Sequence, residues 1–299
     1  MAAYQGSLIS LHEDTDFFRE AVLFTAGHTG LNASLVEKDY YCSVLLAYLY
    51  QHQEAQLVFR GGTSLGKIYA DFYRLSEDLD FVISTPSDAP RSERRRSIAP
   101  VKEWLSNMPN EISAFELPEG IRGYNNSKQY IANVTYNSAV AITDEPAQIK
   151  VEVGLREPLL VPSVRNKART LLVNPFTKNP AVPEFDVLAL TLEEAYAEKI
   201  RAALTRKEPA IRDFYDVDFA VTSLDLDLRE PRLTELVVQK LKVPDNDPID
   251  ISHFRKAALR AQLDTQLKPV LRRRDFEQFD LNRAFELLAE MGSRIMKEK

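Results

Sequence analysis

The sequence predicts an α/β domain with a mixed sheet, preceded by two helices and followed by a helical domain. Three observations lead to this fold class. Short alternating runs, of which 147–155 is the clearest, have the period of strands. The segment 172–185 contains three prolines and little periodicity, which is typical of a boundary. Beyond it, apolar residues recur at helical spacing. We therefore expect an α/β domain at 1–185 and a helical domain at 186–299.

Helical periodicity places two helices ahead of the first strand. Apolar stripes run along 14–27 and 34–51, and a turn-forming segment from Gly27 to Asn32 separates them. In the rest of the first domain we expect strands at 56–60, 78–84, 112–117, 129–142 and 147–155, and helices that begin near Thr63 and span 92–107. Thr191 and Glu194 form a capping-box pattern at the first helix of the second domain. Further helices are predicted at 211–223, 231–242, 250–264 and 281–297.

Composition and charge restrict the class of protein. The formal net charge of −6 argues against a general coat for polyanions, but it allows a local basic groove. The single cysteine, Cys42, lies in an apolar helical run and is expected to be a buried small hydrophobic side chain. The four histidines lack metal-ligand spacing, so zinc is not expected. No secretory signal or membrane span is evident, and we expect a cytoplasmic protein without a membrane partner.

The stretch FRGGTSLGKIYADFYRLSEDLDFVI, residues 59–83, runs from a strand through two glycines into a helix. Backbone N–H groups at such a helix start can face an anion, because glycine has no Cβ in the way. The stretch is not a Walker loop, since Lys67 is followed by Ile68. A paired glycine taken alone has an ordinary explanation as a tight turn. As phosphate-binding candidates we name Gly61, Gly62, Thr63 and Ser64.

A doubled carboxylate follows in the same stretch. The strand period of two puts Asp78 and Asp80 on one face and Leu79 on the other. Two neighbouring carboxylates repel, so a cation normally accompanies them, and carboxylate oxygens suit Mg²⁺. A third acid, Glu152, lies on another alternating strand, and three carboxylates could hold two metals. A lone pair of this kind is usually a solvated strand end. The combination of glycines and carboxylates instead favours binding of a triphosphate and its metal.

These motifs resemble the DNA polymerase β-type nucleotidyltransferase superfamily. The fuller strings Phe59–Leu65 and Arg74–Phe81 resemble one branch of it, the AbiEii-type toxins, close to the MenT toxins. Further matches are Glu37–Tyr40, Lys150–Glu152, Ala197–Ala202 and Arg212–Asp216. The resemblance spans roughly residues 35 to 220 and is carried by these motifs. The remaining C-terminal residues add helices but no motif.

The resemblance implies a polymerase β-like core and an NTP-dependent nucleotidyltransferase that requires Mg²⁺ or Mn²⁺. It further implies a toxin of a bacterial toxin–antitoxin or abortive-infection system that acts in phage defence. Several members of the family add nucleotides to the 3′ end of tRNA and so block translation. We therefore expect tRNA as the acceptor, an NTP as the second substrate, and a cognate antitoxin encoded nearby as the partner.

The resemblance also implies roles for residues outside the glycine turn. Lys199 would balance triphosphate charge, and Asp213 would be an acid of the catalytic site, with Asp216 structural. An acid on a partly apolar helix face needs a partner, which Lys199 or Arg74 would supply; Arg74 is also a candidate for nucleotide binding. Either Glu152 or Asp213 would complete the metal site or accept the proton of the attacking hydroxyl, and the order of these roles stays open.

Ser76 has the strand parity of Asp78 and Asp80, and its resting role is expected to be a hydrogen bond to the backbone. Its position also makes it a candidate for regulatory modification, because added negative charge there would repel a triphosphate.

Two alternatives to tRNA modification remain. The same chemistry could act on a protein side chain or on a small molecule such as an aminoglycoside. Alternatively, the chain could be a non-catalytic binding module on this fold, although its intact motifs argue against that. Two basic clusters, RSERRR at 91–96 and KPVLRRR at 268–274, are either solvated surface or contacts to an RNA backbone.

Overall fold

The structure, a computed structural model, describes residues 10–52, 56–143 and 145–297. The N-terminal stretch in which no secretory signal was expected lies largely outside the described residues. The chain divides into two compact units. Unit 1 comprises Met1–Leu159 and Ser163–Ala189, and unit 2 comprises Leu160–Pro162 and Leu190–Lys299. The proline-rich segment 172–185, expected as a boundary, thus belongs to unit 1, and the division falls after Ala189.

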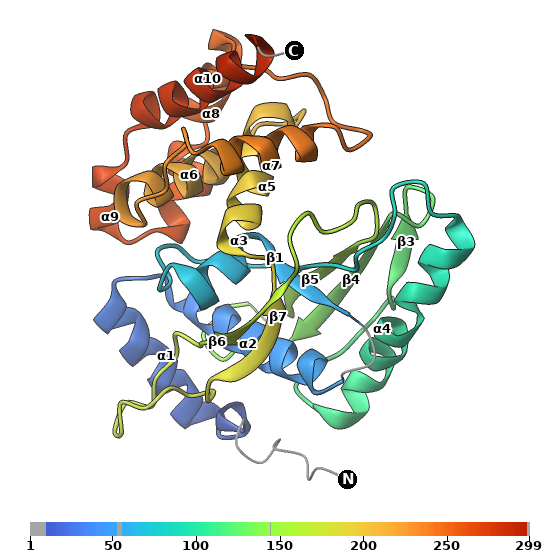
Figure 1. Ribbon diagram of the computed structural model, residues 1–299. Coiled ribbons are helices and arrows are strands. Elements are labelled where there is room, and N and C mark those ends of the chain that lie inside the picture. Colours follow the sequence, from blue (N-terminus) through green and yellow to red (C-terminus); the bar gives the residue numbers. More distant parts are fainter. Residues whose placement is uncertain (1–9, 53–55, 144, 298–299) are drawn as a thin grey trace. The chain divides into compact units, whose positions relative to one another are not determined.

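Unit 1 contains a seven-stranded mixed sheet in the order β3-β4-β5-β2-β1-β7-β6 (Figure 1). The strands are β1 (Val58–Arg60), β2 (Leu79–Val82), β3 (Arg122–Tyr124), β4 (Gln129–Tyr136), β5 (Ala147–Gly154), β6 (Val164–Ala168) and β7 (Phe185–Ala189). Strand β1 pairs antiparallel with β2 and parallel with β7, while β2 pairs parallel with β5. The remaining pairs are antiparallel. The expected α/β class with a mixed sheet is therefore confirmed.

Helices of unit 1 pack against this sheet (Figure 1). They are α1 (Thr15–Thr29), α2 (Ala33–Gln51), α3 (Gly61–Ser64) and α4 (Arg91–Glu111), and the π-helical turn η3 (Leu65–Tyr69) continues α3. Helix α2 is buried along almost its whole length, with Cys42 fully buried, as expected. The Tyr50 hydroxyl of α2 donates to the carbonyls of Leu57 and Leu188. Tyr48 of α2 bonds the Trp104 carbonyl of α4. These bonds fix α2 between the sheet and α4.

Several sequence predictions for unit 1 were wrong in detail. The predicted strand 112–117 is reduced to an isolated bridge between Glu116 and Thr135. The predicted strand 129–142 ends at Tyr136. Strands β3, β6 and β7 were not predicted. Strand β3 is exposed, so it lacks the apolar alternation on which the prediction rests. Strand β7 falls at the supposed domain boundary, where the neighbouring prolines obscured its pattern.

Unit 2 is helical, as expected. Its α-helices are α5 (Leu192–Thr205), α6 (Ile211–Ser223), α7 (Pro231–Leu241), α8 (His253–Arg260), α9 (Arg273–Gln278) and α10 (Leu281–Lys297). Thr191 caps α5 by accepting a hydrogen bond from the Glu194 amide. The Glu194 side chain does not complete the capping box. It accepts from the amides of Leu160 and Val161 and pairs with the buried Lys240 at 2.8 Å. The two amide hydrogen bonds hold the short segment Leu160–Pro162 to α5 of unit 2, and Lys240 balances the charge of Glu194.

None of the helices described in the structure is long and apolar enough to cross a membrane.

Candidate functional site

The glycine turn lies directly after β1 in unit 1. Gly61 has φ +80°, a left-handed conformation that favours glycine. A Cβ at Gly61 would lie 2.5 Å from Asp80 Oδ2, so only glycine allows the turn to approach this carboxylate. Helix α3 starts at Gly61 itself. The expectation that Thr63 caps this helix was therefore wrong, and its hydroxyl instead donates to the Asp78 carbonyl. The turn is thus anchored to the strand that carries the carboxylates.

Three carboxylates come together beside this turn through strand register. Asp80 of β2 is paired with Arg60 of β1 on one side and with Glu152 of β5 on the other. Asp78 precedes β2 by one residue, so it is not on the strand as predicted. The ammonium of Lys150 still lies 3.8 Å from an oxygen of Asp78 and 3.1 Å from one of Glu152. Two of the three side chains predicted as metal ligands, Asp78 and Glu152, therefore lie beside the same ammonium group.

The electrostatics of the carboxylates differ. Burial raises the pKa of the Asp80 carboxyl, and the charge of Arg60 only partly opposes this. Burial also acts to raise the pKa of Glu152, but the nearby Lys150 and a 2.8 Å hydrogen bond from Gln129 outweigh it, so that pKa is lowered. For Lys150, burial acts to lower the pKa, and the charges of Glu152 and Asp78 raise it overall. The site therefore concentrates negative charge that attracts a cation.

All the candidate ligands are carboxylate oxygens, and these are ligands that Mg²⁺ prefers. Within the described residues, however, no group of three His, Cys, Asp or Glu side chains is arranged to hold a metal ion by itself. Mg²⁺ is commonly held by one or two carboxylates together with substrate phosphates. The arrangement of Asp78, Asp80 and Glu152 fits that kind of site, in which the substrate supplies further oxygens.

The remaining predicted residues of the turn differ in what they contact. Ser64 Oγ is buried and has no hydrogen-bond partner among the described residues. The guanidinium of Arg74 packs where a Cβ of Gly62 would be, and Arg74 Nη1 donates to the Leu75 carbonyl at 3.2 Å. Arg74 is only 3% exposed, so it supports the turn from within.

Ser76 lies against the same turn, because its Oγ would be 3.1 Å from a Cβ on Gly62. It precedes β2 by three residues, so the expected strand parity with Asp80 was wrong. No hydrogen bond of its hydroxyl is found among the described residues, and the expected bond to the backbone was also wrong. Ser76 therefore borders the glycine turn with a hydroxyl that is not engaged locally.

The motif Glu37–Tyr40 supports this turn from α2. Lys67 of η3 is 1% exposed and donates to Asp39 Oδ1 at 2.6 Å and to Ser43 Oγ at 2.7 Å. The other oxygen of Asp39 accepts from the Leu171 amide. Lys38 pairs with Glu77, the residue before Asp78, at 3.0 Å. The sequence analysis named this motif without a role. In the structure, its residues hold the glycine turn and the segment before β2 in place.

Lys199 and Asp213 lie together within unit 2. Lys199 Nζ of α5 is 3.1 Å from Asp213 and 2.8 Å from Asp216, both on α6. Arg206 is a further partner of Asp213 at 3.3 Å. The expected pairing of the α6 acids with Lys199 is therefore confirmed. The lysine is 14% exposed at its side chain, so it combines a charge fixed by two carboxylates with limited access. Their role in catalysis stays a prediction.

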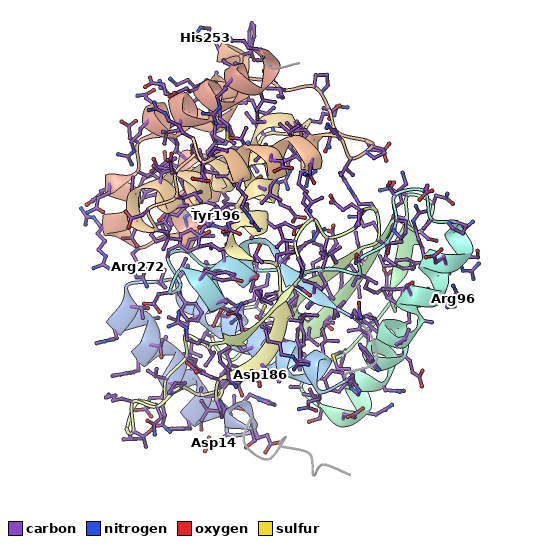
Figure 2. The ribbon with its side chains drawn as sticks, in the orientation of Figure 1. Asp14, Arg96, Asp186, Tyr196, His253 and Arg272 are labelled. Atoms are coloured by element: carbon purple, nitrogen blue, oxygen red, sulfur yellow. The ribbon has the colours of Figure 1, made fainter. Side chains whose placement is uncertain are left out.

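The two basic clusters are built differently. In α4, Arg94 is buried and donates to the carbonyls of Leu155 and Ser87, so it is structural. Arg95 and Arg96 are exposed, and Figure 2 shows Arg96 on the outer side of α4. In the second cluster, Arg273 is paired with Glu277 at 2.7 Å and Arg274 with Asp275 at 3.3 Å. Local ion pairs thus satisfy the second cluster, and the exposed arginines of α4 are the better surface for a polyanion.

The roles of two supporting residues were not predicted, although Lys150 belongs to one of the matched motifs. Gln129 holds Glu152 only because β4 and β5 pair in this register, which the sequence pattern does not fix. Lys150 had a readable signal, since it shares strand parity with Glu152.

Comparison with known proteins bears on the family and the fold of the chain. The family model "Nucleotidyl transferase AbiEii toxin, Type IV TA system" matches residues 44–290, which extends beyond the motifs into the C-terminal helices. Among solved structures, a Helicobacter pylori protein described as a "putative nucleotidyltransferase" is 16% identical, with a TM-score of 0.51. The match covers 90% of this chain and 97% of that one. JHP933 from Helicobacter pylori has the same identity and TM-score, with 90% and 94% covered. These two show the fold. No curated protein matches. The chain belongs to the AbiEii nucleotidyltransferase toxin family of type IV toxin–antitoxin systems.

Proposed function

We propose that this protein transfers a nucleotidyl group from an NTP to the 3′ end of tRNA in a Mg²⁺-dependent reaction, and so blocks translation. The observation that carries the proposal is the register of Arg60, Asp80 and Glu152 across three neighbouring strands, next to a turn that only glycine permits. This register supports the proposal, because it sets two partly buried carboxylates beside a helix start whose backbone N–H groups could meet phosphate oxygens. Family membership supports the reaction class, and the choice of tRNA rests on the resemblance.

In the proposed reaction, the acceptor 3′ hydroxyl attacks the α-phosphorus of the NTP. A new P–O bond forms, the bond to the β-phosphate oxygen breaks, and pyrophosphate leaves with its electron pair. When bound, Mg²⁺ would neutralise triphosphate charge. Asp78 and Asp80 would hold it, with Glu152 as the third oxygen donor or as the acceptor of the hydroxyl proton. The lowered pKa of Glu152 keeps it ionised at neutral pH for either role.

The other residues of the proposal serve binding. The N–H groups at Gly61–Ser64 would contact triphosphate oxygens, and Arg74 would hold that turn in place. Lys199 would balance triphosphate charge, as the resemblance implies, with Asp213 as the acid that orients it. The hydroxyl of Thr63 is engaged by the Asp78 carbonyl, so we assign phosphate contact to backbone groups at this position.

Incubation with each α-³²P-labelled NTP, Mg²⁺ and total RNA tests the function directly. The proposal expects label in the tRNA band with one or more NTPs, and loss of that label when the 3′ terminal hydroxyl of the RNA is oxidised beforehand. Label in a protein band instead would favour modification of a protein side chain. Absence of label in RNA, in protein and in small molecules would favour a non-catalytic binding role.

We further propose that the cognate antitoxin restrains the enzyme, and that modification of Ser76 is one means of doing so. The Ser76 hydroxyl borders Gly62 and has no local hydrogen bond in the described part of the chain. A phosphate or nucleotidyl group there would place negative charge beside the triphosphate site. Intact-mass measurement after co-expression with the neighbouring gene, followed by peptide mapping, would locate the added group. A silenced protein with unmodified Ser76 would indicate inhibition by antitoxin binding, or an antitoxin that acts without direct contact.

A further inference from the structure

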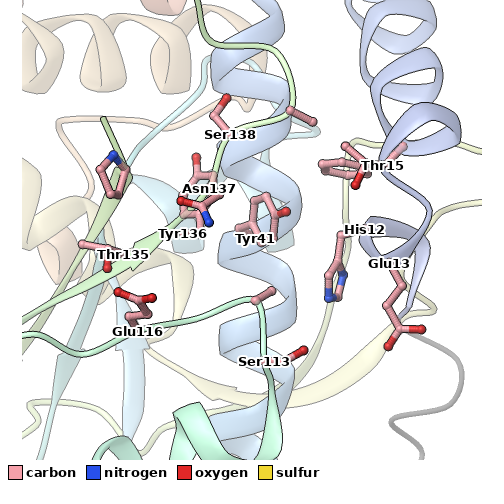
Figure 3. Close-up of a pocket in the computed structure, with 14 residues that line it drawn as sticks. His12, Glu13, Thr15, Tyr41, Ser113, Glu116, Thr135, Tyr136, Asn137 and Ser138 are labelled. Carbon is pink, nitrogen blue, oxygen red and sulfur yellow. The ribbon is translucent and has the colours of Figure 1, made fainter. Parts of the chain in front are cut away.

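A separate cavity of about 280 Å³ lies in unit 1 (Figure 3). Asp78, Asp80 and Glu152 are not among the residues that line it. Its walls come from the 3₁₀ turn η2 (Leu11–Glu13), from α1 and α2, and from the end of β4 with the segment that follows it. At about 30 Å³ per water it has room for roughly nine waters, which suits a fragment-sized ligand. None of the residues that line it in the described structure is a lysine or arginine, so it offers no cation for a phosphate.

Two buried tyrosines form an aromatic wall of this cavity. The rings of Tyr41 and Tyr136 lie 4.0 Å apart between centroids, and the His12 ring lies 5.7 Å from Tyr41. Tyr41 is 4% exposed and Tyr136 is 3% exposed, yet neither hydroxyl has a hydrogen-bond partner among the described residues. Burial raises the pKa of both hydroxyls, so they stay protonated at neutral pH. Both tyrosines line the cavity, so their hydroxyls could exchange hydrogen bonds with a ligand there.

The cavity is also fixed in shape. The buried Glu37 of α2 accepts hydrogen bonds from the Ala139 amide at 2.6 Å and from the Ser138 hydroxyl. These bonds hold the segment that follows β4 against α2. On the other side, His12 Nδ1 and the Tyr40 hydroxyl are 2.8 Å apart, which holds η2 in place. A preformed wall reduces the ordering cost of binding.

The charge of the lining is negative. Glu13 and Glu116 contribute carboxylates, and Figure 3 shows the Glu116 side chain beside Thr135 at the cavity wall. Burial lowers the pKa of His12 below its ordinary value, and the charge of Glu13 only partly opposes this, so the ring is neutral at neutral pH. Carboxylates and hydroxyl oxygens without a competing cation are features that bind an organic cation.

We propose that this cavity is a binding site for a guanidinium group carried on a short alkyl stem. A planar guanidinium forms two parallel hydrogen bonds with a carboxylate, here Glu116, and has further N–H groups for the oxygens around it. The alkyl stem would lie against the apolar part of the wall, and the tyrosine hydroxyls would accept hydrogen bonds from the N–H groups of the guanidinium. The site is independent of the nucleotidyl transfer reaction, because none of the proposed catalytic residues lines the cavity.

Titration of the full-length protein with n-butylguanidinium and with the neutral isostere n-butylurea, followed by calorimetry or NMR, tests the site. The cation should bind at least about tenfold more tightly than the urea. Glu116→Gln should weaken binding of the cation by about tenfold and leave binding of the urea unchanged. Glu116 is exposed, so the variant is expected to fold. Glu103→Gln, at an exposed position of α4 outside the cavity, is the matched control and should change neither affinity.

A blocked arginine, Nα-acetyl-arginine N-methylamide, distinguishes the source of the group. Binding as tight as that of n-butylguanidinium would assign the cavity to an arginine side chain of another protein. Tight binding of n-butylguanidinium alone would assign it to a free small cation. Equal affinity for n-butylguanidinium and n-butylurea, or a cation affinity that Glu116→Gln leaves unchanged, would overturn the proposal.

Discussion

Replacement of Lys67 by methionine should destabilise unit 1 strongly. Lys67 and Asp39 form an ion pair at 2.6 Å in which the side chains are only 1% and 4% exposed. Methionine keeps the length and apolar stem of lysine but removes the ammonium. The Asp39 carboxylate would then lose the ammonium and keep the hydrogen bond from the Leu171 amide. Breaking a buried pair in this way costs about 3–5 kcal/mol, because an uncompensated charge stays in a low-dielectric interior.

The expected loss can be converted into a melting temperature. For a domain of this size, 1 kcal/mol corresponds to a shift of about 2–4 °C, so the variant should melt roughly 6–20 °C lower. The single tryptophan of the chain, Trp104, is buried in α4 of unit 1, and its fluorescence reports unfolding of this unit. Thermal unfolding followed at this tryptophan therefore measures the effect where it is expected.

A double variant and a control make the test specific. Lys67→Met with Asp39→Asn removes both charges and keeps an oxygen for the Leu171 amide, so it should recover at least half of the loss. Lys167 pairs with Asp186 at 3.0 Å, but both side chains are more than half exposed. Lys167→Met should therefore cost less than about 1 kcal/mol. A Lys67→Met protein that melts within about 2 °C of the wild type would refute the structural role given to this pair.

Three further predictions concern the site and its surface. Burial raises the pKa of Asp80, so the stability of the wild type falls as the pH rises through that pKa. Asp80→Asn should therefore raise the melting temperature at pH 7. Thermal unfolding at several pH values should show this gain shrinking toward about pH 4. Gly61→Ala should lower the transfer rate by at least about tenfold, because a Cβ would collide with Asp80 and the backbone has φ +80°; single-turnover kinetics on a protein with unchanged circular dichroism would check this. Replacing Arg95 and Arg96 by glutamine should reduce the slope of log K for RNA binding against log salt concentration by up to about two. An unchanged slope would mean that these side chains are solvated and do not contact the RNA.

The parts of the fold that follow local patterns could be predicted from the sequence. Strand β5 alternates cleanly and was predicted at nearly its observed bounds, and α5 begins directly after its predicted N-cap residue, Thr191. Strand β3 could not be predicted, because three exposed residues that pair only with β4 leave no apolar signal. The π-helical turn η3 was also hidden, since nothing in its composition distinguishes it from an α-helix.

The candidate site was predictable to the extent that it depends on spacing along the chain. The glycine turn and the two aspartates are close in sequence, and the structure brings them together. The contributions of Gln129 and Lys67 depend on strand register and on packing between distant segments, which no local pattern encodes. The burial of Arg94 could not be predicted either, because a run of arginines suggests an exposed segment whatever one of its side chains contacts.

The most direct test of the account is the rate of nucleotide transfer by Asp80→Asn, compared with wild type and with Asp186→Asn. Asp186 is exposed and lies on β7 of the same unit, so its variant controls for the loss of one carboxylate. With Mg²⁺, a labelled NTP and RNA, the account predicts that Asp80→Asn loses transfer by at least about a thousandfold while it stays folded, and that Asp186→Asn keeps the wild-type rate. Wild-type transfer by a well-folded Asp80→Asn protein would contradict the assignment of these carboxylates as the catalytic site.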